Sequence, residues 1–147
     1  DILQNWERLK EVERQEDGRQ EISVLSGVPR ALPALAQAEV YQERAVRVGF
    51  DWPEIQGVLD KLLEEVEEVR TAEGEAQRAM EFGDLLFSVV NLARWYGVDA
   101  ESSLREANAR FFQRFAYIEK AARDSGRRIQ DLSLEEMEAY WQLAKRR

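Results

Sequence analysis

The sequence predicts an all-α protein, and three observations support this fold class. Apolar residues recur at helical spacing through nearly the whole chain, no segment alternates apolar and polar residues as a half-buried strand does, and helix-start and helix-stop signals separate the periodic segments. At 147 residues the chain suits one compact domain. Four consecutive helices between residues 33 and 124, joined by short loops, indicate a four-helix-bundle-like arrangement.

The first helix is predicted over residues 2–16, where apolar side chains recur on successive turns. Asp17 and Gly18 end it, and a stretch that mixes Gly, Ser and polar residues follows. Residues 1–26 are therefore predicted to form an N-terminal helix with a mobile connector, and residues 27–147 to form the main domain.

The second helix is predicted to begin at Pro33, because proline fits the first turn of a helix, and to end at Gly49, which suits a left-handed C-cap. Asp51 and Glu54 resemble a capping box that starts the third helix, which runs to about Arg70. This third helix carries the first of two acidic clusters.

The fourth helix spans roughly residues 75–96 and is apolar on almost every side, so it is expected to be largely buried. The fifth spans residues 100–124, with Asp99 as its N-cap. Ser133 and Glu136 form a second capping box, which starts a C-terminal accessory helix. Because one chain of this size can hardly cover the fourth helix, we expect a two-fold homodimer.

The composition argues against several classes of function. The formal net charge of −8 argues against nucleic-acid binding, which depends on clustered Lys and Arg. The chain has no Cys and no His, so it lacks a thiolate nucleophile and the usual zinc sites. No signal-peptide pattern and no run of about 18 apolar residues is found, so no membrane partner is expected and a cytoplasmic protein is the default.

Two acidic clusters lie on the neighbouring third and fourth helices. On a helical wheel, the first cluster places Glu64, Glu65 and Glu68 within an arc of about 100°, and Lys61 lies inside that arc. Like charges at this spacing repel one another, so the grouping costs stability unless a cation lies among them. A solvated helix face is the alternative interpretation of this run.

The second cluster, Glu81 and Asp84, favours a site because its helix is otherwise apolar. Carboxylates are seldom buried without a partner, so positive charge is expected to meet these two. If the third and fourth helices pack antiparallel about the turn near Gly74, all five acids can face one another. Their oxygen atoms suit Mg²⁺, Mn²⁺ or Ca²⁺, and five acids are enough for more than one ion.

A phosphate ligand would also need cationic side chains. The sequence has neither GxxxxGK[ST] nor GxGxxG, so a backbone cradle of either kind is absent. Lys61 and the pair Arg110 and Arg114, one helical turn apart, are the alternatives. Trp141 or Tyr117 could offer a flat surface to a base. The two arginines could instead pair with the acidic helices, and Trp141 could belong to the core.

These motifs resemble the MazG family of all-α nucleoside triphosphate pyrophosphohydrolases. The resemblance lies in the ordered pattern Glu-Glu-x-x-Glu, a spacer and Glu-x-x-Asp, and it runs from about residue 27 to the end. Flanking segments that also resemble the family are Val48-Gly49-Phe50-Asp51-Trp52, Gly83-Asp84-Leu85-Leu86-Phe87, Val90-Asn91-Leu92-Ala93-Arg94 and Ala107-Asn108-x-Arg110-Phe111. Among members with two tandem domains, the chain is similar to the second, C-terminal catalytic domain.

The resemblance implies Mg²⁺-dependent hydrolysis of nucleoside triphosphates between the α and β phosphates, with Mn²⁺ as a substitute cofactor. The products would be a nucleoside monophosphate and pyrophosphate. By matching position, the metal ligands would be Glu65, Glu68, Glu81 and Asp84, and Glu64 would be a further ligand or a proton acceptor.

The family pattern also implies a set of substrate contacts. Lys61, Arg110 and Arg114 fall where the family contacts the triphosphate, and Trp141 and Lys145 fall near the nucleotide. The sequence therefore predicts a hydrolase of broad, house-cleaning specificity for nucleotides. The alternative is a non-catalytic helical module that binds nucleotide or a protein partner. A di-iron carboxylate bundle is disfavoured because it expects histidine ligands.

Overall fold

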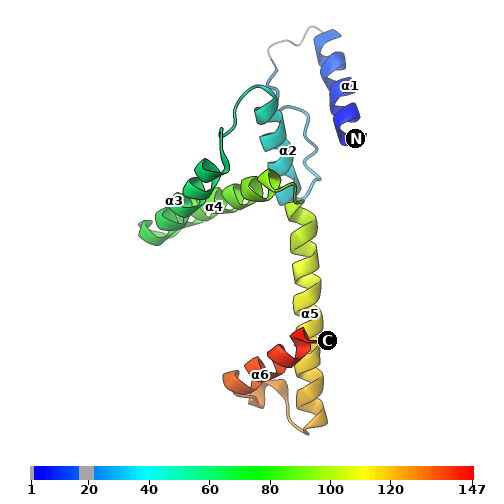
Figure 1. Cartoon of the computed structure of the whole chain (residues 1–147), viewed down its shortest axis with the longest axis vertical. Coiled ribbons are helices and arrows are strands. Elements are labelled where there is room, and N and C mark those ends of the chain that lie inside the picture. The colour runs from blue at the N-terminus through cyan, green and yellow to red at the C-terminus, as the bar shows by residue number, and fades with distance from the viewer. Residues whose placement is uncertain (1, 17–21) are drawn as a thin grey trace. The chain divides into compact units, whose positions relative to one another are not determined.

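A computed structural model describes residues 2–16 and 22–147, and every regular element in this part of the chain is helical. The all-α fold class predicted from the sequence is confirmed. The chain divides into two compact units, Asp1–Gly97 and Val98–Arg147 (Figure 1). No helix in the described part of the chain is both long enough and apolar enough to cross a membrane.

The helices follow the predicted bounds closely. In chain order they are α1 (Ile2–Glu16), α2 (Ala34–Arg47), α3 (Ile55–Thr71), α4 (Glu75–Trp95), α5 (Ala100–Asp124), the 3-10 helix η1 (Ile129–Asp131) and α6 (Leu134–Lys145). Asp17 and Gly18, which were predicted to end α1, lie outside the described residues. The arrangement of four consecutive helices as one bundle stays a prediction.

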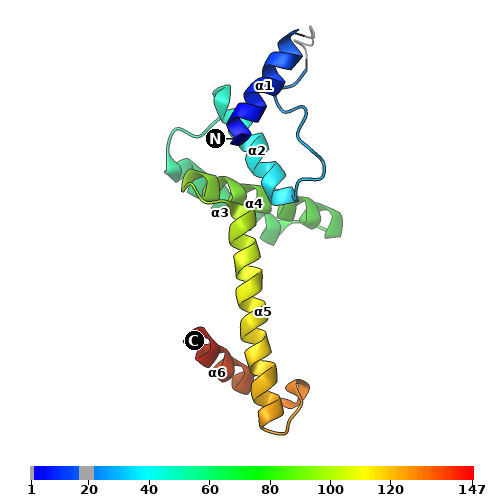
Figure 2. The same ribbon diagram turned by 90° about the vertical axis from the view of Figure 1, so that its right-hand side faces the viewer.

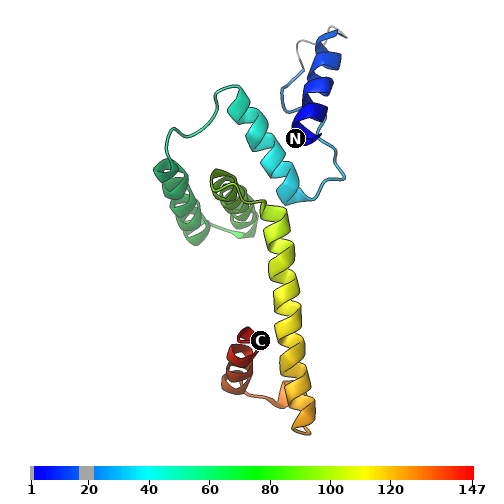
Figure 3. The same cartoon turned by 45° about the vertical axis from the view of Figure 1, so that its right-hand side comes forward.

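Two glycines make the turns of the first unit possible. Gly49 has φ 92°, the left-handed conformation predicted for the end of α2. Gly74 has φ 85° and lets the chain reverse between α3 and α4 over a very short connection. The two helices consequently lie side by side and antiparallel (Figures 1 and 3). α2 packs against α4, where Gln42 Nε2 donates a hydrogen bond of 2.9 Å to the carbonyl oxygen of Phe87.

The predicted caps of the last two α-helices are confirmed. The Asp99 side chain accepts a hydrogen bond of 3.1 Å from the Ser102 backbone N–H at the start of α5. Ser133 and Glu136 form the complete capping box at the start of α6. Both signals lie within four residues of the helix start, so local sequence was enough to predict them.

The capping box predicted from Asp51 and Glu54 is wrong. α3 begins after Glu54 without a side-chain cap. The Asp51 carboxylate instead accepts a hydrogen bond from the Trp52 backbone N–H at 2.8 Å and from the Arg94 guanidinium of α4 at 2.9 Å. A guanidinium forms a stronger hydrogen bond with a carboxylate than a neutral backbone amide does. The loop before α3 is therefore tied to α4.

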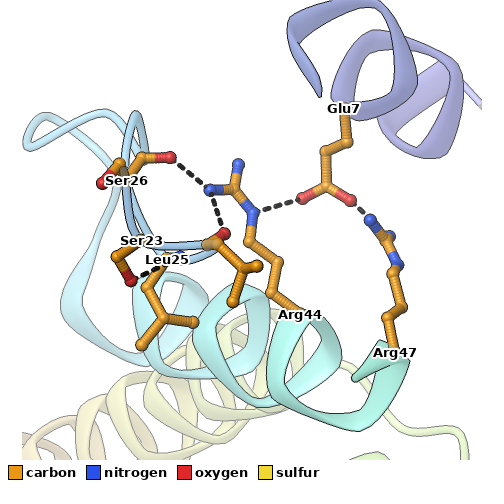
Figure 4. A network of polar contacts seen from close by, with 7 residues as sticks. Glu7, Ser23, Leu25, Ser26, Arg44 and Arg47 are labelled. Carbon is orange, nitrogen blue, oxygen red and sulfur yellow. Dashed lines mark hydrogen bonds and ion pairs between the residues drawn. The ribbon is translucent and has the colours of Figure 1, made fainter. Parts of the chain in front are cut away.

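A buried carboxylate joins α1 to α2 (Figure 4). Glu7 is only 3% exposed, and it accepts hydrogen bonds from Arg44 Nε at 3.3 Å and from Arg47. Arg44 is also buried, and its guanidinium donates to the backbone carbonyl oxygens of Val24 and Ser26. These contacts hold both α1 and the segment before α2 in place.

In the second unit, α6 folds back beside the C-terminal half of α5 (Figure 2). Ile118, Ala122 and Leu132 form its buried core. Partly buried side chains pack against this core, namely Ile129, Met137, Tyr140 and Trp141. The η1 turn contributes to the core by carrying the chain from α5 to α6.

The prediction that α4 is largely buried is wrong for the described residues of a single chain. Phe82, Leu86, Phe87 and Val89 are between 44% and 55% exposed. The α4 side chains that α2 and α3 do cover include Val90 and the polar Glu81 and Ser88. This exposure agrees with the expectation that one chain of this size can hardly cover α4, and its burial by a second copy stays a prediction.

Candidate metal centre

Carboxylates from α3 and α4 converge about two helical turns from the connection that joins these helices. One oxygen atom each of Glu65, Glu81 and Asp84 lies within 4.8 Å of the other two. In an antiparallel helical hairpin, residues equally far from the turn lie opposite one another, and Glu65 and Glu81 are about equally far from it. Asp84 lies one helical turn beyond Glu81 on the same face. We call these residues the three-carboxylate group.

The members of the group differ in their exposure to water. Glu65 is 5% exposed and Glu81 is 9% exposed, whereas Asp84 is exposed. The pKa of Glu81 is raised, first because burial disfavours the ionised carboxylate and then because Glu68, Asp84 and Glu65 repel it. The charge of Lys61 opposes this shift. An ionised Glu81 side chain therefore destabilises the folded chain when no cation is bound.

Lys61 lies beside this group. Its Nζ is 2.9 Å from Glu65 Oε1 and 3.7 Å from a carboxylate oxygen of Glu64. The hydrogen bond to Glu65 raises the pKa of Lys61, and the charges of Glu65, Glu64 and Asp84 add to this effect while desolvation opposes it. One ammonium against several carboxylates leaves the surroundings negative, so a further cation would be stabilised there.

The donor set fits a hard divalent cation. All three donors are carboxylate oxygens, which Mg²⁺ and Mn²⁺ prefer to nitrogen or sulfur ligands. Ligand oxygens on opposite sides of a Mg²⁺ ion are about 4.2 Å apart. The separation of at most 4.8 Å within the group is therefore close to the spacing that a shared ion requires.

The other two predicted acids lie outside the three-carboxylate group. The Glu64 side chain is 60% exposed and has Lys61 as its ion-pair partner at 3.7 Å. Glu68 is exposed, but among the neighbouring charges it contributes most to the raised pKa of Glu81, after burial. Glu68 is therefore close enough to act on the group, and a ligand role for Glu64 or Glu68 stays a prediction.

Four of the five side chains predicted to contact the nucleotide belong to the second unit. The guanidinium carbon of Arg114 lies 5.5 Å from the ring centroid of Trp141, and the Phe111 centroid lies 5.6 Å from the same ring. Arg110 and Lys145 are exposed. Trp141 is partly buried against the core of this unit, so it has the packing role that the sequence left open. A role in nucleotide binding stays a prediction.

Sequence reasoning missed the polar networks that connect segments far apart in the chain. Arg44 and Arg47 have a helical spacing that brings them to one face of α2, but no local pattern points to Glu7, 37 residues before Arg44. Arg94 similarly joins Asn91 Oδ1, at 3.0 Å from Nε and 2.8 Å from Nη2, to the loop before α3. The only signal was the presence of arginines near the ends of both helices.

The fold and the three-carboxylate group define the chain as an all-α protein suited to bind a divalent cation through oxygen ligands. No family model matches the chain. It is 38% identical over 141 residues to the nucleoside triphosphate pyrophosphohydrolase/pyrophosphatase MazG of Thermotoga maritima, covering 96% of the chain and 55% of that relative. It is 40% identical over 151 residues to the nucleoside triphosphate pyrophosphohydrolase of Escherichia coli K12, covering 99% of the chain and 57% of that relative.

The similarity to these relatives covers nearly the whole chain and confirms the resemblance to the MazG family inferred from its motifs. It is also 40% identical over 149 residues to the protein YabN of Bacillus subtilis, covering 99% of the chain and 30% of YabN. The chain thus spans a little more than half the length of the Thermotoga and Escherichia relatives and a smaller part of YabN.

Proposed function

We propose that the chain hydrolyses nucleoside triphosphates to nucleoside monophosphates and pyrophosphate in a Mg²⁺-dependent reaction. The observation that carries the proposal is the convergence of Glu65, Glu81 and Asp84, whose oxygen atoms lie within 4.8 Å of one another. The names of the Thermotoga and Escherichia relatives support the same activity. Broad, house-cleaning specificity and a cytoplasmic location stay predictions.

The residues of the first unit would divide the chemical work. Glu65, Glu81 and Asp84 would hold Mg²⁺ or Mn²⁺, with Glu68 close enough to assist. The bound ion would neutralise charge on the phosphates and make water more acidic. The chain has no histidine, so the proton of the attacking water would pass to a carboxylate, for which the exposed Glu64 is our candidate, or would be lost from metal-bound water.

Cationic and aromatic side chains would bind the nucleotide. Lys61, which lies beside the three-carboxylate group, would contact the triphosphate. Arg110 and Arg114 of α5 would contact it as well, since guanidinium groups bind phosphate with two parallel hydrogen bonds. Trp141 and Lys145 would contact the nucleoside end. The position of Arg114 over the Trp141 ring places a cation and a flat aromatic surface next to each other.

We also propose that the chain works as a homodimer. Apolar side chains of α4 remain exposed in one copy, among them Phe82 and Leu86 at 48% and 55%. An exposed apolar helix face is typical of an interface, and a two-fold dimer is the simplest closed assembly that covers it. Light scattering coupled to gel filtration tests this: a mass of one chain at micromolar concentration would contradict it.

Pyrophosphate release tests the activity directly. The purified chain is mixed with each nucleoside triphosphate and Mg²⁺, and pyrophosphate and orthophosphate are measured separately, which distinguishes cleavage after the α phosphate from loss of the γ phosphate. Glu65→Gln should abolish pyrophosphate release. Glu67→Gln is the matched control, because Glu67 is exposed on the same helix and pairs with Arg70. If the natural chain binds nucleotide without releasing pyrophosphate, the non-catalytic alternative is correct.

A further inference from the structure

Lys61 forms an ion pair with one member of the three-carboxylate group. Its ammonium lies 2.9 Å from Glu65 Oε1, and Glu65 is the least exposed member of the three-carboxylate group, with 5% of its surface accessible. The Lys61 side chain itself is 40% exposed, so it can leave this position for water without unfolding the helix. The ammonium is therefore a movable charge at a nearly buried ligand.

A divalent ion and this ammonium would lie close together if both contacted Glu65. An ion about 2.1 Å from the oxygen that Lys61 contacts would be no more than about 5 Å from Nζ. This separation is shorter than the Debye length of about 8 Å at physiological salt, so solvent ions screen the repulsion only in part. The positive charges of the ion and of Lys61 therefore oppose each other's binding.

We infer that Lys61 is a resident counter-cation of Glu65 that competes with the divalent ion and lowers its affinity. This inference deepens the proposed function and rests on it. The ammonium stabilises Glu65 and Glu64 while the acids repel one another, and it gives up this contact when the metal binds. Once released, it is available to the triphosphate, the contact proposed above for Lys61.

Three possible roles for Lys61 predict three different effects of its removal on metal affinity. A competing counter-cation predicts that removal of the ammonium tightens metal binding in the absence of nucleotide. A side chain that only contacts phosphate predicts no change, because no phosphate is present. A structural strut that holds Glu65 in place predicts weaker binding once it is lost. Metal affinity without nucleotide therefore separates the three roles.

The experiment measures Mn²⁺ binding to the full chain at low salt, by the loss of the free-ion signal in electron paramagnetic resonance. Lys61→Met should lower the dissociation constant about tenfold, as expected for one positive charge about 5 Å from a doubly charged ion in partly screened solvent. Lys61→Gln should act in the same direction. Lys61→Arg keeps the charge and should stay within about twofold of the natural chain, on the same reasoning.

Lys120→Met is the matched control. Lys120 of α5 lies 2.8 Å from Asp124 in an exposed pair with the same four-residue spacing. Its substitution should leave Mn²⁺ affinity unchanged. Circular dichroism of each variant checks that the helices form.

The outcomes separate this inference from the proposed function. If Lys61→Met and Lys61→Gln bind Mn²⁺ as the natural chain does, or more weakly, while Glu65→Gln loses binding, the competition is refuted and the metal site stands. If the natural chain binds no Mn²⁺, both the inference and the proposed metal site are overturned. Tighter binding by both Lys61 variants, with unchanged binding by Lys120→Met, supports the competition.

Discussion

Replacement of Asp84 by asparagine should stabilise the metal-free chain and weaken the stabilisation that metal binding provides. The Asp84 oxygen lies within 4.8 Å of oxygen atoms of both Glu65 and Glu81. Two unit charges at this distance repel by about 0.9 kcal/mol in water, so removal of the Asp84 charge relieves about 2 kcal/mol, or about 1 kcal/mol after screening by physiological salt. For a chain of this size, that stabilisation raises Tm by about 2–4 °C in the presence of a chelator.

Addition of Mg²⁺ should reverse the order of stability. An ion at ten times its dissociation constant stabilises the folded natural chain by about 1.4 kcal/mol. The Asp84→Asn chain has lost one charged ligand, so it should gain much less. The natural chain should therefore melt below the variant in EDTA and should match or exceed it in saturating Mg²⁺.

Differential scanning calorimetry in EDTA and across a Mg²⁺ titration provides the assay. Asp60→Asn is the control, because Asp60 is exposed on α3 and accepts a hydrogen bond of 2.8 Å from Gln56 rather than facing the group. It should leave the Mg²⁺ response intact. The reasoning is refuted if Asp84→Asn lowers Tm in EDTA, or if Mg²⁺ raises the Tm of this variant as much as that of the natural chain.

The pKa of Glu81 is raised in the folded chain, so its stabilising contribution in EDTA is fully present below the carboxyl pKa of the unfolded chain. That contribution is lost as pH rises through the folded pKa, so the natural chain should lose stability relative to Glu81→Gln over this interval. Melting temperatures of the two chains that change in parallel with pH would contradict this. Glu7→Gln should lower the free energy of unfolding by about 3 kcal/mol and speed amide hydrogen exchange in α1, because it breaks a buried ion pair. Glu11→Gln, on the exposed surface of α1, should do neither. Equal exchange rates in the two variants would show that the buried pair does not hold α1 in place. Gly57→Ala would place a Cβ 2.7 Å from the Trp52 ring, so it should lower the free energy of unfolding by about 1 kcal/mol. It should also shift the near-ultraviolet circular dichroism of that ring. An unchanged spectrum would count against the contact.

Local sequence signals were sufficient for the helices and for much of the acidic cluster. The caps at Asp99 and Ser133 depend on groups within one turn, so a short segment contains all the information. The convergence of Glu65 and Glu81 depends on helical spacing and on one very short connection, which leaves the two helices little choice other than antiparallel packing. Local geometry was therefore predictable wherever few torsion angles decided it.

Long-range polar pairs were not predictable in this way. Asp51 has the spacing of a cap, but Arg94, 43 residues later, competes for its carboxylate. Glu7 lies on a helix of mixed polar residues, and only the fold shows that it meets Arg44. A charged side chain can pair with any opposite charge that the fold brings within reach, so its sequence neighbours do not identify the partner.

The burial of charge in the three-carboxylate group argues for cation binding over a purely structural role. Glu65 and Glu81 are nearly inaccessible to water, and burial together with the neighbouring carboxylates of Glu68, Asp84 and Glu65 raises the pKa of Glu81. Replacement of buried charged groups by apolar side chains of similar volume is often neutral or stabilising, so a hairpin that served only as a scaffold would gain from such residues. Two nearly buried acids and a third on the solvent side are thus costly to the chain alone, and the ion that removes this cost is the one whose ligands they match.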